Sequence, residues 1–294
     1  MSRSEATIRL HEDADLFLEA VRFTAAETRF TPHLIEKDYF CSVLLEYLAG
    51  EDTLVFKGGT CLAKVHSGFY RLSEDLDFIV PVASDASRAE RRRRVAGVKR
   101  AFSALPEALP GFHFVDPITG ANNSTQYLGV VGYHSLLTRE DQSIKIEVGL
   151  REPLVTPVER GLAQTLLLDP ITGEARLAPI KASCMSRQEA FAEKFRAALT
   201  RRQPAIRDFF DIDHATRKQG LRTAEDDFVR LVGVKLSIPG TEALDVSPQR
   251  LADLRRQLEP QLKPVLREED LREFDLDRAF EAVVQMARSL RGDT

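Results

Sequence analysis

Two aspartates, Asp75 and Asp77, flank Leu76 at the start of a short apolar segment, LDFIV at residues 76–80. We interpret this segment as a strand, and because side chains alternate along a strand, both carboxylates project from one face. Adjacent carboxylates repel each other unless a cation lies between them. Mg²⁺ prefers carboxylate oxygen, phosphate oxygen and water, so the pair predicts a magnesium site for a phosphorylated substrate. The alternative is an acidic strand edge that faces water.

A glycine-rich turn precedes the two aspartates. Gly58, Gly59 and Thr60 follow the apolar segment 53–57 and come before residues 61–66, which can begin a helix. Two glycines let backbone N–H groups approach a phosphate closely, and a helix N-terminus favours negative charge. The turn is not a P-loop, because the Gly-Lys-Ser/Thr ending is missing. Its position favours the metal interpretation of the aspartates over the solvated edge.

A third carboxylate lies in the alternating segment IKIEV at residues 144–148. Its isoleucines and valine form one face, while Lys145 and Glu147 lie on the other. If this strand neighbours the one at 76–80, Glu147 joins the two aspartates as a metal ligand. Three carboxylates can hold two metal ions about 3.5–4 Å apart, an arrangement used for in-line displacement at phosphorus. The alternative is a solvated strand residue.

The remaining patterns indicate an α+β protein with strands in the first half and helices in the second. Helical spacing covers 15–25, 32–48 and 87–105, and alternation indicates strands at 126–133 and 143–150. From about residue 181 the pattern is helical, and Ser186 with Glu189 fits a capping box that opens a helix to 201. We expect an α/β domain with N-terminal helices over 1–180 and a helical C-terminal lobe over 181–294.

Basic residues provide two candidate contacts for phosphate. Lys194 and Arg207 can neutralise a triphosphate or a leaving pyrophosphate. The alternatives are a surface lysine and a structural ion pair between Arg207 and Asp208. The segment 88–100 carries five arginines before Val95 and two more cations after it, against a single acid, so it can bind RNA phosphates or form a solvated helix face.

Composition limits the function classes. The chain has 294 residues with 43% hydrophobic and 29% charged residues, and its net charge of −4 gives no overall attraction to nucleic acid. It has no apolar run long enough for a membrane span, and its polar N-terminus does not resemble a signal peptide. Cys41, Cys61 and Cys184 are interpreted as reduced, buried thiols of a cytoplasmic protein. The six histidines contain no pair at metal-ligand spacing.

Five segments together resemble the AbiEii/AbiGii toxin family of nucleotidyltransferases, which includes MenT-type toxins that modify tRNA. They span about 34–215 and read, in order, EKDY at 36–39, KGGT at 57–60, RLSEDLD at 71–77, IKIE at 144–147, and Lys194 with Arg207, Asp208 and Asp211. The resemblance implies a DNA-polymerase-β-type nucleotidyltransferase fold, with a mixed sheet in the domain over 1–180 and a C-terminal lobe over 181–294 that completes the active site. It also implies a toxin of a toxin–antitoxin or phage-defence system. Such a protein takes an NTP as substrate, uses one or two Mg²⁺ ions and pairs with an antitoxin.

The resemblance also implies roles for individual residues. Nucleotide binding falls to Lys57, Gly58, Gly59, Thr60, Ser73 and Arg207; catalysis to Asp75, Asp77, Lys194 and Asp211; and metal binding to Asp75, Asp77 and Glu147. The favoured acceptor is the 3′ end of tRNA. Three rival interpretations stay open: the same fold modifying a protein or a small molecule, a non-catalytic module that binds nucleotide or RNA, and an acidic structural protein whose basic helix binds a protein partner. One departure is Glu147, where the family pattern leads us to expect aspartate.

Overall fold

The computed structural model describes residues 9–292, so most of the N-terminal segment that lacks a signal-peptide pattern lies outside the described residues. The chain forms two compact units, Met1–Met185 and Ser186–Thr294, which divide after residue 185, somewhat later than the boundary expected at 180. No helix among residues 9–292 is long and apolar enough to cross a membrane.

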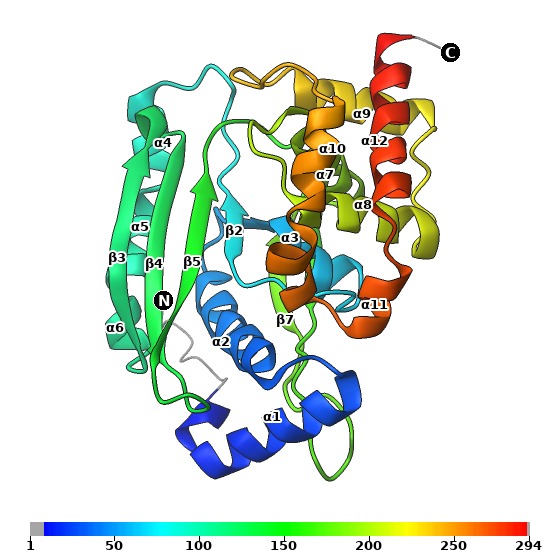
Figure 1. Ribbon diagram of the computed structural model, residues 1–294. Helices are drawn as coiled ribbons and strands as arrows, with labels where there is room; N and C mark the ends of the chain where they lie inside the picture. The colour runs from blue at the N-terminus through cyan, green and yellow to red at the C-terminus, as the bar shows by residue number, and fades with distance from the viewer. Residues whose placement is uncertain (1–8, 293–294) are drawn as a thin grey trace. The chain divides into compact units, whose positions relative to one another are not determined.

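The first unit is built on a mixed seven-stranded sheet in the order β3-β4-β5-β2-β1-β7-β6 (Figure 1). The strands are β1 (Val55–Lys57), β2 (Leu76–Ile79), β3 (Phe112–Ala121), β4 (Gln126–His134), β5 (Asp141–Gly149), β6 (Glu159–Ala163) and β7 (Ile180–Cys184). β2 runs parallel to β5 and β1 runs parallel to β7, whereas the other neighbours are antiparallel. The strands at 76–80, 126–133 and 143–150 are confirmed within one or two residues.

Helices of this unit are η1 (Leu10–Glu12), α1 (Ala14–Thr28), α2 (Pro32–Leu48), α3 (Gly58–Cys61), η2 (Leu62–His66), α4 (Arg88–Arg94), α5 (Ala96–Ser103), α6 (Leu105–Ala108) and η3 (Asn122–Ser124). The helix expected over 32–48 is confirmed. The single helix expected over 87–105 is wrong, because the chain breaks it into three short helices. Its cap is present: the Ser87 hydroxyl accepts the Glu90 N–H at 3.2 Å.

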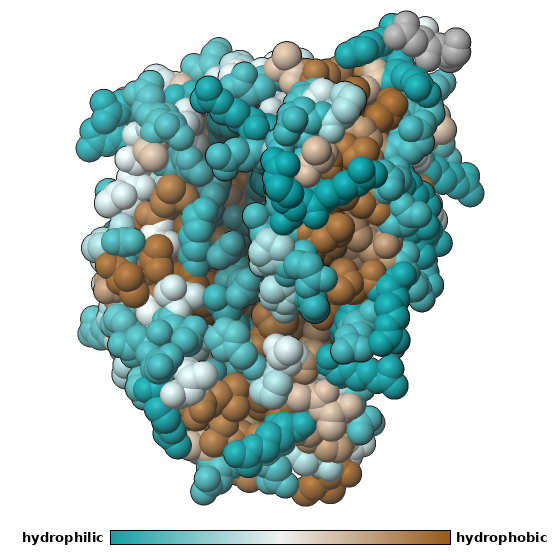
Figure 2. All heavy atoms as spheres, viewed as in Figure 1, coloured by the Kyte–Doolittle hydropathy of each residue, from teal (hydrophilic) through white to brown (hydrophobic). Residues whose placement is uncertain are grey.

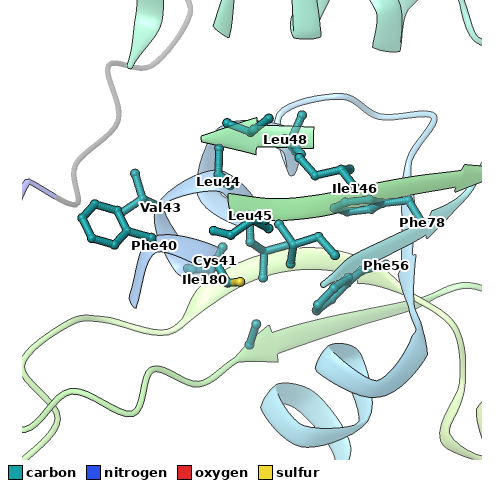
Figure 3. Packing of buried hydrophobic residues seen from close by; sticks show 14 of the residues in the cluster. Phe40, Cys41, Val43, Leu44, Leu45, Leu48, Phe56, Phe78, Ile146 and Ile180 are labelled. Carbon is teal, nitrogen blue, oxygen red and sulfur yellow. The ribbon is translucent and has the colours of Figure 1, made fainter. Parts of the chain in front are cut away.

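Helix α2 forms the centre of the core. Figure 3 shows side chains of α2, among them Leu44 and Leu45, in one buried cluster with Phe56, Phe78, Ile146 and Ile180, which come from β1, β2, β5 and β7. Apolar residues of α5, among them Val98 and Phe102, belong to the same buried cluster. We call the face of the sheet that meets this core the inner face, and the opposite one the outer face.

The outer face carries the alternate residues of each strand. Leu128 and Val130 on β4 are half-buried and alternate with the buried Tyr127 and Val131. Over β3 and β4, Figure 2 shows brown apolar side chains within a largely hydrophilic surface. The outer face is therefore partly apolar on β3 and β4.

Within residues 186–292 the second unit consists of helices joined by loops, without strands. Its elements are α7 (Arg187–Thr200), α8 (Ile206–Lys218), α9 (Asp226–Leu236), α10 (Pro248–Arg255), η4 (Leu258–Leu262), η5 (Lys263–Val265), α11 (Glu268–Glu273) and α12 (Leu276–Arg291). The helix expected from Ser186 to 201 is confirmed as α7, and the Ser186 hydroxyl accepts the Glu189 N–H at 3.2 Å. The fold is thus α+β as expected, although the strands extend past the first half to Cys184.

Candidate active site

One row of charged residues crosses three neighbouring strands. Asp77 of β2 is the direct partner of Glu147 of β5 in parallel register, and Lys57 of β1 is the direct partner of Asp77 in antiparallel register. Paired residues of neighbouring strands point to the same side of a sheet. Since Leu76 and Phe78 are buried in the core, Lys57, Asp77 and Glu147 lie together on the outer face. Leu128 of β4 is the direct partner of Glu147 on the other side, so the row of charged residues ends at an apolar side chain.

The glycine turn lies against this row. Gly58 has φ +76°, and a Cβ atom placed on it would lie 2.2 Å from Asp77 Oδ2. A Cβ on Gly59 would lie 2.7 Å from Arg71 Nη2 and 3.1 Å from Ser73 Oγ. Only glycine allows this backbone to approach the carboxylate, the guanidinium and the hydroxyl so closely. The two glycines do not precede the helix, as the sequence suggested, but form the first turn of α3.

Thr60 connects the turn to the first aspartate. Its side chain is buried, and its hydroxyl donates to the Asp75 carbonyl oxygen at 2.5 Å. Asp75 comes immediately before β2, so this bond anchors the residue where the strand begins. The Thr60 hydroxyl therefore positions the loop of Asp75.

The Glu147 carboxylate is already hydrogen-bonded. Its Oε1 accepts from Gln126 Nε2 at 2.7 Å, and its Oε2 lies 3.5 Å from Lys145 Nζ. The side chain is 32% exposed, so it remains open to solvent on the outer face. Side chains of β4 and β5 thus hold both oxygens of this carboxylate.

Two charged residues of helix α2, Lys37 and Asp38, form ion pairs with segments that flank the site. Lys37 Nζ lies 3.2 Å from Glu74 Oε1, next to Asp75 in sequence. Asp38 forms a buried ion pair with Lys64 of η2 at 2.7 Å, and Ser42 Oγ accepts from the same ammonium at 2.9 Å. An ion pair sealed in a core needs both partners, because either one alone is an uncompensated buried charge. Sequence reasoning assigned no role to Lys64, although its partner Asp38 belongs to the EKDY segment.

The sequence also gave no role to Arg71. Its side chain is 2% exposed, and its Nη1 donates to the Leu72 carbonyl at 3.1 Å. Its other terminal nitrogen, Nη2, would lie 2.7 Å from a Cβ atom placed on Gly59. A positive charge held behind the glycine turn lowers the cost of bringing an anion to the same turn. The sequence feature that could have identified Arg71 is its position at the start of the segment RLSEDLD at 71–77.

In the second unit, Lys194 of α7 bridges two buried carboxylates of α8. Its Nζ lies 2.7 Å from Asp208 Oδ1 and 2.9 Å from Asp211 Oδ2. Arg201 Nη1 lies 3.1 Å from the other oxygen of Asp208. Arg207 donates from Nε to the Gln261 carbonyl at 3.2 Å. Arg201 is a second cation beside these carboxylates, and the sequence did not indicate it.

The basic segment 88–100 lies on the inner side of the sheet. Arg91 is buried, whereas the cations Arg88, Arg92, Arg93, Arg94, Lys99 and Arg100 are exposed. Val95 and Val98, between them in sequence, pack into the core cluster together with Ile146 of β5. Because Glu147 follows Ile146 and points the opposite way, the basic helices and the charged row lie on opposite faces of the sheet.

Comparison with known proteins identifies the family. The family described as nucleotidyl transferase AbiEii toxin, type IV toxin–antitoxin system, matches residues 43–286, which include the charged row and the Lys194 cluster. No curated protein matches the chain significantly.

Three solved structures resemble the fold. A candidate nucleotidyltransferase from H. pylori is 17% identical, with 90% of this chain and 96% of that chain covered and a TM-score of 0.51. The protein JHP933 from Helicobacter pylori is 17% identical over 90% and 94% of the two chains, with a TM-score of 0.50. The nucleotidyltransferase toxin MenT4 from Mycobacterium tuberculosis is 18% identical over 87% and 92%, with a TM-score of 0.48.

Proposed function

Because the chain belongs to the AbiEii family of nucleotidyltransferase toxins, we propose that it transfers a nucleoside monophosphate from an NTP to an acceptor hydroxyl at the charged row. The observation that carries this proposal is the register that pairs Asp77 with Glu147, directly beside the turn at Gly58. Carboxylates and an anion-accepting turn are the two parts that phosphoryl transfer needs in one place.

The carboxylates suit a hard divalent cation. Asp75, Asp77 and Glu147 offer oxygen ligands, and their side chains are half-buried, which leaves a path from solvent. When bound, one or two Mg²⁺ ions would neutralise charge on the phosphates and offset the repulsion between the carboxylates. We assign Asp75 and Asp77 to the first ion. Glu147, which Gln126 already orients, is assigned to the second.

The turn and its neighbours would hold the triphosphate. We assign the backbone N–H groups of Gly58 and Gly59 and the hydroxyl of Ser73 to the phosphates, since no side chain at either glycine screens them. Lys57, in register beside Asp77, adds a positive charge at the same end of β1. These groups position the triphosphate, and such positioning accounts for most of the catalysis of this reaction class.

The helical unit would contribute a second cationic group. We propose that Lys194 and Arg207 bind phosphates of the nucleotide. Asp211 is fully buried against the Lys194 ammonium, so we assign it the task of fixing that ammonium in place, not of contacting substrate. Lys194 keeps 14% of its side chain exposed, so the residue is in contact with solvent.

The proposed acceptor is the 3′ hydroxyl of a tRNA, because the sequence resembles MenT-type toxins that modify tRNA. Its oxygen forms a bond to the α-phosphorus, the bond from that phosphorus to the bridging oxygen breaks, and pyrophosphate leaves with that oxygen. The acceptor's proton passes to solvent. We further propose a cognate antitoxin, since the matched family is the toxin of a type IV toxin–antitoxin system.

The experiment incubates purified protein with total tRNA, Mg²⁺ and each α-³²P-labelled NTP in turn, beside Asp75→Asn and Asp116→Asn. Asp116 is exposed on β3, so its variant controls for the loss of one surface charge. Label in tRNA, lost only with Asp75→Asn, supports the proposal. Label in a protein or small-molecule fraction keeps the transfer and contradicts the tRNA acceptor. An absence of label from every fraction contradicts the transfer itself.

A further inference from the structure

A second group of potential metal ligands lies on the inner side of the same sheet. The ligand atoms of Cys61, His66 and Cys184 all lie within 4.8 Å of one another. Cys61 ends α3, His66 ends η2 and Cys184 ends β7, so three separate elements of the first unit meet there. The widely spaced cysteines and scattered histidines indicated no such site, because the residues are neighbours only in the folded chain.

The group has the chemistry of a binding site for a borderline-soft cation. Two thiols and one imidazole are the ligand types that Zn²⁺ selects over the carboxylates preferred by Mg²⁺. Zn–S bonds of about 2.3 Å and Zn–N bonds of about 2.0 Å place tetrahedral ligand atoms roughly 3.5–3.8 Å apart. The separations in the structure are thus within about 1 Å of what zinc requires.

The surroundings already orient the ligands. His66 Nε2 lies 2.9 Å from the Met185 carbonyl oxygen, which fixes this nitrogen as the N–H donor and leaves Nδ1 with its lone pair. A ligating histidine ordinarily donates its other ring N–H to such an acceptor. A Cβ on Gly161 would lie 2.7 Å from Cys184 Sγ, so the glycine on β6 leaves room for that sulfur.

A backbone carbonyl of β6 also lies next to these residues. The Cys184 thiol lies 3.7 Å from the Glu159 carbonyl oxygen, a further oxygen beside the cluster. The third cysteine, Cys41, is buried in α2 and is not a member of the group.

We propose that Cys61, His66 and Cys184 bind one Zn²⁺ ion, with a water molecule or the Glu159 carbonyl as fourth ligand. Coordination displaces the thiol protons of Cys61 and Cys184 to solvent. Because Cys61 directly follows Thr60, the ion ties the helix of the glycine turn to β7. It therefore stabilises the phosphate turn without taking part in nucleotidyl transfer.

The first test adds Co²⁺, a spectroscopic substitute for Zn²⁺, to chelator-treated full-length protein. We expect a thiolate-to-cobalt charge-transfer band that saturates at one equivalent and is abolished by adding Zn²⁺. Zn²⁺ should also raise the thermal unfolding midpoint, since a ligand that binds only the folded state stabilises it. If the unaltered protein gives no such band, or if mild oxidation links Cys61 to Cys184 in protein that takes up no cobalt, the proposal is overturned.

Single-residue variants test whether the cobalt band comes from these three ligands. Cys184→Ala should abolish the band, and His66→Gln, at the half-buried edge, should weaken cobalt binding by about tenfold or more. Cys41→Ser and Asp75→Asn should keep it, since neither residue belongs to the group. A band that survives in folded Cys184→Ala contradicts the proposal. The Asp75→Asn result makes the outcome independent of the proposed nucleotidyl transfer.

Discussion

Gly58 and Asp77 lie so close that a single added methyl group would meet the carboxylate: the Cβ position is 2.2 Å from Asp77 Oδ2. Gly58 is thus required twice, once by its φ of +76° and once by the carboxylate that occupies the space of a side chain. The turn and the aspartate form one structural unit. Changing either one displaces the other.

Gly58→Ala should reduce nucleotidyl transfer by about 100-fold or more, because a shift of the carboxylate by about 1 Å costs that much in positioning. Gly173→Ala is the matched control, since Gly173 has φ +73° with nothing within 4 Å of its Cβ position. Both variants carry the same backbone strain. Equal activity in the two variants would contradict the importance of the close contact between Gly58 and Asp77. Transfer is measured as label incorporated per unit time.

Asp77→Asn should lower transfer by about three orders of magnitude while leaving the metal-free protein at least as stable as the parent. Removing one of two adjacent carboxylates relieves their repulsion, but it also removes a ligand of the proposed ion. Thermal unfolding without divalent cations and transfer with Mg²⁺ measure the two effects. A variant that is both destabilised and fully active would argue against a metal role for Asp77.

Lys64→Met should cost about 3–5 kcal/mol of unfolding free energy, because Asp38 would remain as a buried charge without its cation. The double variant Asp38→Leu with Lys64→Met should recover much of that loss. Urea denaturation of the single and double variants gives the coupling between the two residues. Lys99→Met, at an exposed position, should change stability by less than about 0.5 kcal/mol.

Lys194→Met should destabilise the helical unit and abolish transfer, since Asp208 and Asp211 would face each other without the bridging ammonium. Stability and function can be separated by Lys194→Met combined with Asp208→Asn and Asp211→Asn. The triple variant should regain the unfolding midpoint but not the transfer. Recovery of transfer as well would leave Lys194 with a structural role alone.

Charge reversal at Arg92 and Arg93 should weaken tRNA binding if the basic segment holds the body of the RNA. Each lost phosphate contact should also make the dependence of affinity on salt shallower. The double variant should leave the charged row intact, because the two arginines and the row lie on opposite faces of the sheet. Binding is measured by fluorescence anisotropy over a salt series. Unchanged affinity and slope would place the RNA surface elsewhere on the protein.

Local sequence determined much of the molecule. Helix α2, strands β4 and β5 and the caps Ser87 and Ser186 follow from periodicity and side-chain chemistry that act over a few residues. The Asp75–Asp77 pair was recognisable because two carboxylates on one face of a strand are costly without a function. The resemblance of five short segments then indicated the family that the comparison identified.

Tertiary structure alone decided what depends on distant partners. Strand β3 contains Pro117 and Gly120 and is largely exposed, and β6 reads ERGLA, so neither carries the alternation by which strands are recognised. The register of β2 against β5 brought Glu147 beside Asp77. Folding also brought Cys184 to Cys61 and gave Asp208 its partner Arg201. Strand register, burial and ion pairing are decided by the free energies of contacts between residues far apart in the sequence. A local sequence pattern does not contain this information.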